Sequence, residues 1–84
     1  MTITLKLFAS LTQYLPPDAR PKQEARLEMA AGATILDVIH RTRIPEASCA
    51  IVLLDGAWVA RADRATTPLA DGQAIAIWPP VAGG

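Results

Sequence analysis

The chain has 84 residues, 51% of them apolar and 19% charged, and its eight Lys and Arg residues balance its eight Asp and Glu residues. A chain of this length forms one small domain, and its apolar content is too high for intrinsic disorder. Its neutral charge disfavours nonspecific binding to nucleic acid or to a membrane surface, because both need a concentrated basic field. Charged residues interrupt every apolar run, so we predict no membrane-spanning helix.

Two strands are predicted in the N-terminal part of the chain. Residues 2–8 alternate between an apolar and a mixed face, which indicates a half-buried strand. A short helical turn over 9–15 and a polar loop over 16–23 follow, because two consecutive prolines interrupt regular structure there. Alternation resumes over 25–29, which predicts a second strand near an edge of the sheet.

One helix is predicted next. Thr34, followed three residues later by Asp37, approximates a capping box at the start of the helix. The pattern ends just after Ile44, where Pro45 cannot continue a helix. This helix has one apolar side, formed by Ile35, Leu36, Val38 and Ile39.

Three more strands are predicted in the C-terminal half. The continuous apolar run over 50–54 indicates a buried strand, and Asp-Gly at 55–56 is typical of a type I′ hairpin that leads to a partner strand over 57–60. A polar, turn-rich segment over 61–72 precedes the last strand over 74–78. The element order predicts an α+β roll, with one main helix across a mixed sheet of four or five strands.

The last six residues combine a stiff stem with a slim tip. Pro79 and Pro80 favour an extended backbone, and six extended residues span about 20 Å. Gly83 and Gly84 lack a Cβ atom and can enter a channel too narrow for a side chain. Such a tip can deliver a carboxylate into the active site of another protein, although terminal glycines are also typical of frayed chain ends.

A C-terminal carboxyl group is ionised at neutral pH and is a poor electrophile, so it must be activated. Adenylation by ATP would form a mixed anhydride. A sulfur donor would then leave a thiocarboxylate, whereas an acceptor amine would leave an amide. These two products distinguish a sulfur carrier from a protein modifier.

Three segments resemble the MoaD/ThiS family of ubiquitin-like sulfur carriers, in particular the small subunits of molybdopterin synthases. They are Phe-Ala-Ser-Leu at 8–11, Pro-Leu-Ala-Asp-Gly at 68–72 and Trp-Pro-Pro-Val-Ala-Gly-Gly at 78–84. The resemblance implies a β-grasp (ubiquitin-like) fold in which the first and last strands lie side by side at the centre of the sheet. It divides the chain into a β-grasp domain over 1–78 and an extended C-terminal tail over 79–84.

The resemblance also implies partners. An E1-like adenylyltransferase would use ATP to activate Gly84, and a sulfurtransferase system would convert it to the thiocarboxylate. The tail would then enter the large subunit of molybdopterin synthase, where the sulfur is transferred to cyclic pyranopterin monophosphate to build the molybdenum cofactor. The chain itself would be non-catalytic, with no bound cofactor or metal.

Each terminal residue has an expected role. Gly84 is the adenylation and thiocarboxylation site, and Gly83 provides clearance. The residues expected to contact partners are Phe8, Trp78, Pro79, Pro80, Val81 and Ala82. Three alternatives remain: a carrier for thiazole, tungsten-cofactor or other synthesis, a ubiquitin-like protein modifier, and a β-grasp binding module without tail chemistry.

The remaining chemically distinctive residues favour structural interpretations. Cys49 and His40 are the only cysteine and histidine, too few for a disulfide framework, a structural zinc site or an iron–sulfur cluster. We expect Cys49 to be a buried hydrophobe, His40 to be solvated, and the location to be the reducing cytoplasm. Trp58 fits equally a hairpin edge or the rim of an interface. Scattered arginines are expected to form a solvated face and not a docking surface: Arg41, Arg43, Arg61 and Arg64.

Overall fold

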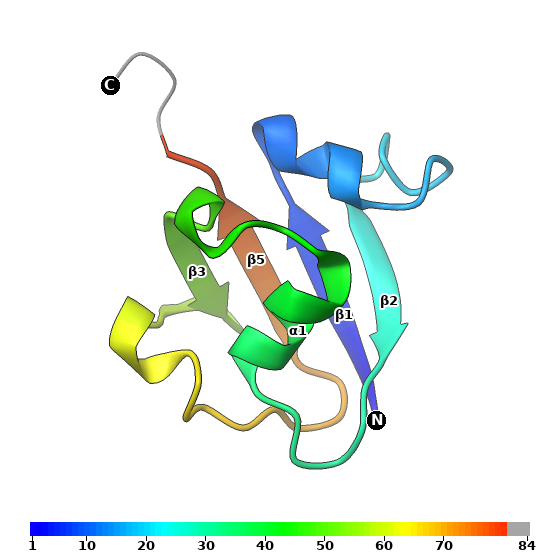
Figure 1. The fold of residues 1–84 in the computed structure, drawn as a ribbon. Helices are drawn as coiled ribbons and strands as arrows, with labels where there is room; N and C mark the ends of the chain where they lie inside the picture. The colour runs from blue at the N-terminus through cyan, green and yellow to red at the C-terminus, as the bar shows by residue number, and fades with distance from the viewer. Residues whose placement is uncertain (81–84) are drawn as a thin grey trace.

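A mixed sheet with one α-helix across one of its faces forms the domain (Figure 1). The computed structural model describes residues 1–80, so Val81, Ala82, Gly83 and Gly84 lie outside the described residues. Within residues 1–80 the strands are β1 (Thr2–Leu7), β2 (Glu24–Glu28), β3 (Ile51–Leu54), β4 (Ala57–Trp58) and β5 (Ala74–Trp78), and the α-helix is α1 (Ile35–Thr42). Short 3-10 helices, η1 (Ala9–Tyr14), η2 (Glu46–Ser48) and η3 (Arg61–Asp63), lie in the connections. The predicted α+β roll is confirmed.

The sheet has the strand order β2-β1-β5-β3-β4. β1 and β5 pair in parallel, whereas β2 pairs antiparallel with β1, and β3 pairs antiparallel with both β5 and β4. The first and last strands therefore lie side by side at the centre, as expected. β5 is hydrogen-bonded on both sides, so the segment that follows Trp78 begins from a well-anchored strand.

Period-two alternation places the apolar residues of the central strands beneath α1. Ile3, Leu5 and Leu7 of β1 are buried, as are Ile75 and Ile77 of β5. They belong to one core cluster with the apolar side of α1, formed by Ile35, Val38 and Ile39. Full burial of each such side chain is worth about 1.5–3 kcal/mol, so this layer is the main source of stability.

The predicted capping box starts α1. The backbone N–H of Asp37 donates to Thr34 Oγ1 at 3.2 Å, and the backbone N–H of Thr34 donates to Asp37 Oδ2 at 2.8 Å. The predicted end just after Ile44 is wrong, because Arg43 adopts a left-handed backbone with φ of +66° and ends the helix at Thr42. None of the helices described within residues 1–80 has the length and apolarity that a membrane span requires.

The β3–β4 hairpin differs from its prediction in burial and length. Both turn residues have positive φ, +48° at Asp55 and +84° at Gly56, as a type I′ turn requires. However, the prediction of a buried strand is wrong, because Val52 is buried and Ile51 is 45% exposed. Val52 packs into the core cluster that includes the apolar side of α1, whereas Ile51 lies on the opposite face of the sheet. β4 keeps two residues in the ladder instead of the predicted four.

Candidate functional site

The sheet face opposite α1 carries the candidate site. Paired residues of neighbouring strands lie on the same face, so the register assigns residues to it. Leu53 pairs with both Ala76 and Trp58, and Ile51 pairs with Trp78. We call these five residues, together with Phe8, the apolar face: Phe8, Ile51, Leu53, Trp58, Ala76 and Trp78.

Phe8 and Trp78 form the aromatic centre of the apolar face. Their rings are stacked, with centroids 4.3 Å apart and planes inclined by 7°. The backbone N–H of Phe8 donates to the carbonyl of Ile77 at 3.3 Å, which brings Phe8 beside the end of β5. The prediction that these two aromatic residues share the face opposite the helix is confirmed. A stacked aromatic pair adds about 0.5–1.5 kcal/mol to the stability gained by burial. Here the stacking stabilises the position of Trp78, the last residue of β5.

A groove lies beside this stack. It has a volume of about 300 Å³ and is lined by Ile51, Leu53, Trp78 and Pro79. Trp58, on the same face, is 67% exposed. Clustered exposed apolar side chains are typical of protein interfaces. Ile51 and Leu53 were not among the residues that the sequence predicted for this surface. Trp58 therefore lies on the rim of the face as well as on a hairpin edge.

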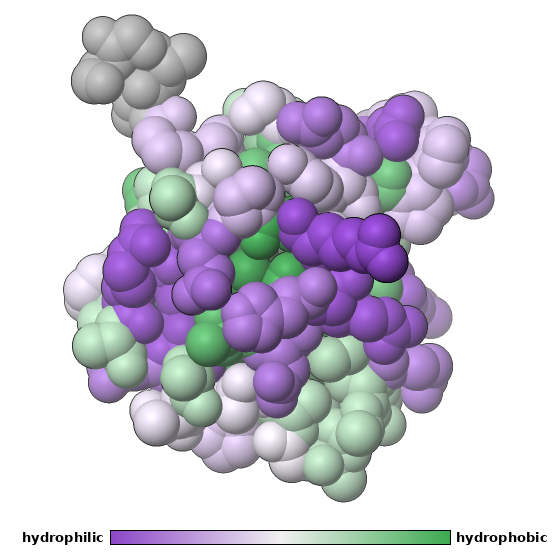
Figure 2. Space-filling view, viewed as in Figure 1, coloured by the Kyte–Doolittle hydropathy of each residue, from purple (hydrophilic) through white to green (hydrophobic). Residues whose placement is uncertain are grey.

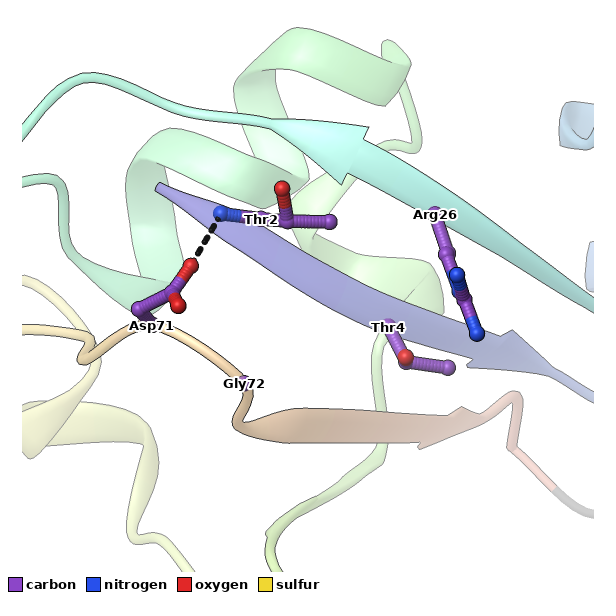
Figure 3. Close-up of a pocket in the computed structure, with 5 residues that line it drawn as sticks. All are labelled: Thr2, Thr4, Arg26, Asp71 and Gly72. Carbon is purple, nitrogen blue, oxygen red and sulfur yellow. Dashed lines mark hydrogen bonds between the residues drawn. The ribbon is translucent and has the colours of Figure 1, made fainter.

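The other half of this sheet face is polar. Lys6 pairs with Glu24, and Thr4 pairs with Arg26. A second groove, of about 270 Å³, is lined by Thr2, Thr4, Arg26, Asp71 and Gly72 (Figure 3). There Asp71 Oδ1 accepts a hydrogen bond from the backbone N–H of Thr2 at 2.7 Å, so the carboxylate fastens the turn before β5.

The polar groove lies at the start of β5, whereas the apolar groove lies at its end, where the tail begins. Trp78 is the last residue of β5, and its carbonyl accepts a hydrogen bond from the backbone N–H of Ala50 at 2.9 Å. Pro79 lines the apolar groove and Pro80 is exposed. Neither proline has an N–H to continue the ladder. The other predicted site residues, Val81, Ala82, Gly83 and Gly84, lie outside the described residues.

The helix side of the molecule has a different surface. Hydrophilic residues cover most of the face that carries α1 (Figure 2). His40 is exposed there, with its Nε2 3.2 Å from Glu46 Oε2, and Arg41 and Arg43 are exposed as predicted. Across the described part of the chain, no three His, Cys, Asp or Glu side chains are grouped as metal ligands would be.

Two chemically distinctive residues that follow 3-10 helices, Cys49 after η2 and Arg64 after η3, are buried. Cys49 is fully buried, as expected, and burial raises the pKa of its thiol, an effect that the charges of Arg64 and Arg61 oppose. The prediction of a solvated Arg64 is wrong, because Arg64 is only 4% exposed. Burial is also the main cause that lowers the pKa of its guanidinium, with a further contribution from the neighbouring charge of Arg61.

Comparison with known proteins identifies the family. The model of the ThiS family matches residues 5–84. A comparison with curated protein sequences gave no match. Among solved structures, the HVO 2177 protein of Haloferax volcanii superposes with a TM-score of 0.75 and 25% identity, over 100% of this chain and 87% of that one.

Two further structures share the fold at lower identity. The small archaeal modifier protein 1 of H. volcanii has a TM-score of 0.68 and 21% identity, over 95% of this chain and 98% of that one. A chain in the complex of subunits 1 and 2 of the molybdopterin-converting factor from Helicobacter pylori 26695 has a TM-score of 0.62 and 18% identity, over the full length of both chains. The fold is thus the ubiquitin-like β-grasp, and the chain belongs to the ThiS family, the MoaD/ThiS group of ubiquitin-like sulfur carriers.

Proposed function

We propose that this protein carries sulfur as a thiocarboxylate at Gly84 and donates it to cyclic pyranopterin monophosphate in molybdopterin synthesis. The observation that carries the proposal is the position of the apolar face. Its stacked Trp78 is also the last residue of β5, so the docking surface and the start of the tail coincide. A partner that binds this face therefore receives the tail at a defined point.

The tail supplies the carboxylate, and the partners supply the catalytic groups. A carboxylate oxygen of Gly84 attacks the α-phosphorus of ATP, which releases pyrophosphate and forms an acyl adenylate. A hydrosulfide equivalent from a sulfurtransferase system then attacks the acyl carbon and displaces AMP, which leaves the thiocarboxylate. A C-terminal carboxyl group, with an ordinary pKa of about 3.3–3.7, is ionised at neutral pH and is therefore a poor electrophile, so activation by ATP is needed. The ATP is bound by an E1-like adenylyltransferase. We place this chemistry in the cytoplasm.

The residues of this chain position the reacting group. Gly83 and Gly84 fit a narrow active-site channel, and Pro79 and Pro80 limit the conformations that the stem must lose on binding. The apolar face binds first the adenylyltransferase and then a large synthase subunit. In the H. pylori molybdopterin-converting factor, subunits 1 and 2 form a protein–protein complex, and we propose a comparable pair here.

Intact mass spectrometry tests the carrier function. After incubation with ATP, an E1-like adenylyltransferase and a sulfur source, we expect the mass increase of one oxygen replaced by sulfur. A variant without Gly83 and Gly84 is the control and should keep its mass. The enzyme's competence is checked in a parallel reaction with another carrier protein that it activates. If that reaction succeeds and the wild-type mass stays unchanged, the proposal is contradicted.

A second assay tests the sulfur acceptor. The thiocarboxylated protein is mixed with a large synthase subunit and cyclic pyranopterin monophosphate, and the dithiolene product is measured. Its formation supports the molybdopterin assignment. A thiocarboxylate that transfers sulfur to a thiazole precursor instead would assign the protein to thiazole synthesis.

Protein modification is the second candidate, favoured by the match to the small archaeal modifier protein 1. In this case Gly84 ends in an isopeptide bond to a lysine of another protein. The expected result is a set of higher-mass conjugates in cell lysate that survive reductant. Their absence, together with thiocarboxylate formation, would favour the carrier.

A further inference from the structure

Arg64 places a cation inside the molecule, in contact with the segment that leads into β3. It directly follows η3 and is the only buried charged side chain within residues 1–80. One terminal nitrogen, Nη1, donates to the carbonyl of Cys49 at 2.8 Å, and the other, Nη2, donates to the carbonyl of Ala50 at 3.5 Å. The third guanidinium nitrogen, Nε, has no hydrogen-bond partner within residues 1–80. No carboxylate among these residues forms an ion pair with Arg64.

The two carbonyls that Arg64 binds belong to the segment that holds the end of β5. The backbone N–H of Ala50 donates to the carbonyl of Trp78 at 2.9 Å, and the next residue, Ile51, is paired with Trp78 in the ladder. The carbonyls of Cys49 and Ala50 therefore bind Arg64, while the amide of Ala50 binds Trp78.

The backbone of Arg64 is anchored as well. Its carbonyl accepts a hydrogen bond from the backbone N–H of Leu36 at 3.0 Å, in the first turn of α1. A nearby carbonyl, that of Thr67, accepts from the N–H of Ile35 at 3.3 Å. Helix N–H groups at this end have no partner within the helix, so the loop satisfies them. A continuous series of bonds thus runs from α1 through Arg64 and Ala50 to Trp78.

We infer that Arg64 is a positioning residue that fixes the direction in which the tail leaves the sheet. It acts through the hydrogen bond between Ala50 and Trp78 and does not touch the reacting group. Its importance for sulfur loading rests on the proposed function. Without the guanidinium, the carbonyls of Cys49 and Ala50 lose a buried donor, and residues 49–50 can open more often.

Amide hydrogen exchange tests the anchoring. Arg64→Met keeps an apolar side chain of similar length and removes the donors, and Arg64→Lys retains the charge and one donor group. Arg43→Met, at an exposed arginine directly after α1, is the matched control. We expect the Ala50 amide in Arg64→Met to exchange about tenfold faster relative to the Leu5 amide of β1, with partial recovery in Arg64→Lys and no change in the control. Equal acceleration at Ala50 and Leu5 would overturn the inference.

Adenylation kinetics test the consequence for the tail. Because the apolar face remains, we expect Arg64→Met to lower kcat about tenfold and to change KM by less than about twofold. A wild-type kcat despite faster Ala50 exchange would also overturn the positioning role. If the wild-type protein itself is not adenylated, the proposed function fails, whereas the exchange measurement still decides whether Arg64 anchors Trp78.

Discussion

At the scale of single residues, Cys49 couples the fold to pH. Its thiol is fully buried, with Sγ 3.7 Å from the carbonyl oxygen of Pro45. Burial raises the pKa of this thiol more than the charges of Arg64 and Arg61 lower it. A sulfur relay needs an accessible thiolate, and this environment favours a buried neutral thiol.

Replacing Cys49 should change how stability depends on pH. Above the ordinary thiol pKa, the unfolded chain releases the proton that the native state retains, so the free energy of unfolding falls as the pH rises. Below that pKa both states keep the proton and Cys49 adds no slope. We therefore expect wild type to lose more stability than Cys49→Ala between about pH 8 and about pH 10. Urea unfolding at several pH values measures this, and parallel curves for the two proteins would contradict it.

Sequence predicted some members of the site and missed others for physical reasons. Strand alternation placed Phe8 and Trp78 on the face opposite the helix. Ile51 was missed because a continuous apolar run does not show which of its residues face a helix. Arg64 was missed because its burial depends on how the segment over 61–72 packs across the start of α1, which no local pattern encodes.

At the scale of elements, α1 depends on its ends. A helix of eight residues is too short to be stable alone, so capping and packing must maintain it. Thr34 and Asp37 were recognised as a capping box because both partners lie within four residues. The helix end was not, because the left-handed backbone of Arg43 has no distinctive residue type. Likewise, the length of β4 depends on how far it follows β3, so local sequence predicted the hairpin and overestimated the strand.

The capping box gives the second prediction. Thr34→Ala and Asp37→Ala should each lower the free energy of unfolding by about 1 kcal/mol, since each removes one of the two reciprocal hydrogen bonds. Each bond also holds the geometry of the other. The double variant should therefore lose less than the sum of the two single losses, by about 0.5 kcal/mol. Urea unfolding of the four proteins completes the cycle, and strictly additive losses would show that the two bonds act independently.

At the scale of the whole molecule, the two faces of one sheet have separate tasks. β5 contributes to both, because Ile75 and Ile77 point into the core and Ala76 and Trp78 lie on the apolar face. Alternation predicted this division. The parallel pairing of β1 with β5 came from the family resemblance, since strands at opposite ends of a chain carry no local signal for each other.

Two isoleucines on neighbouring strands separate folding from docking. Ile77→Ala removes a fully buried side chain and should lower the free energy of unfolding by about 2–5 kcal/mol. Ile51→Ala removes a half-exposed one and should lower it by less than about 1 kcal/mol. Because Ile51 lines the apolar groove, its variant should bind the adenylyltransferase about tenfold more weakly. If Ile77→Ala does not fold, Ile77→Val replaces it, with an expected loss of about 0.5–1.5 kcal/mol in the free energy of unfolding. Urea unfolding and titration calorimetry measure the two effects, and wild-type affinity in Ile51→Ala would remove the groove from the docking surface.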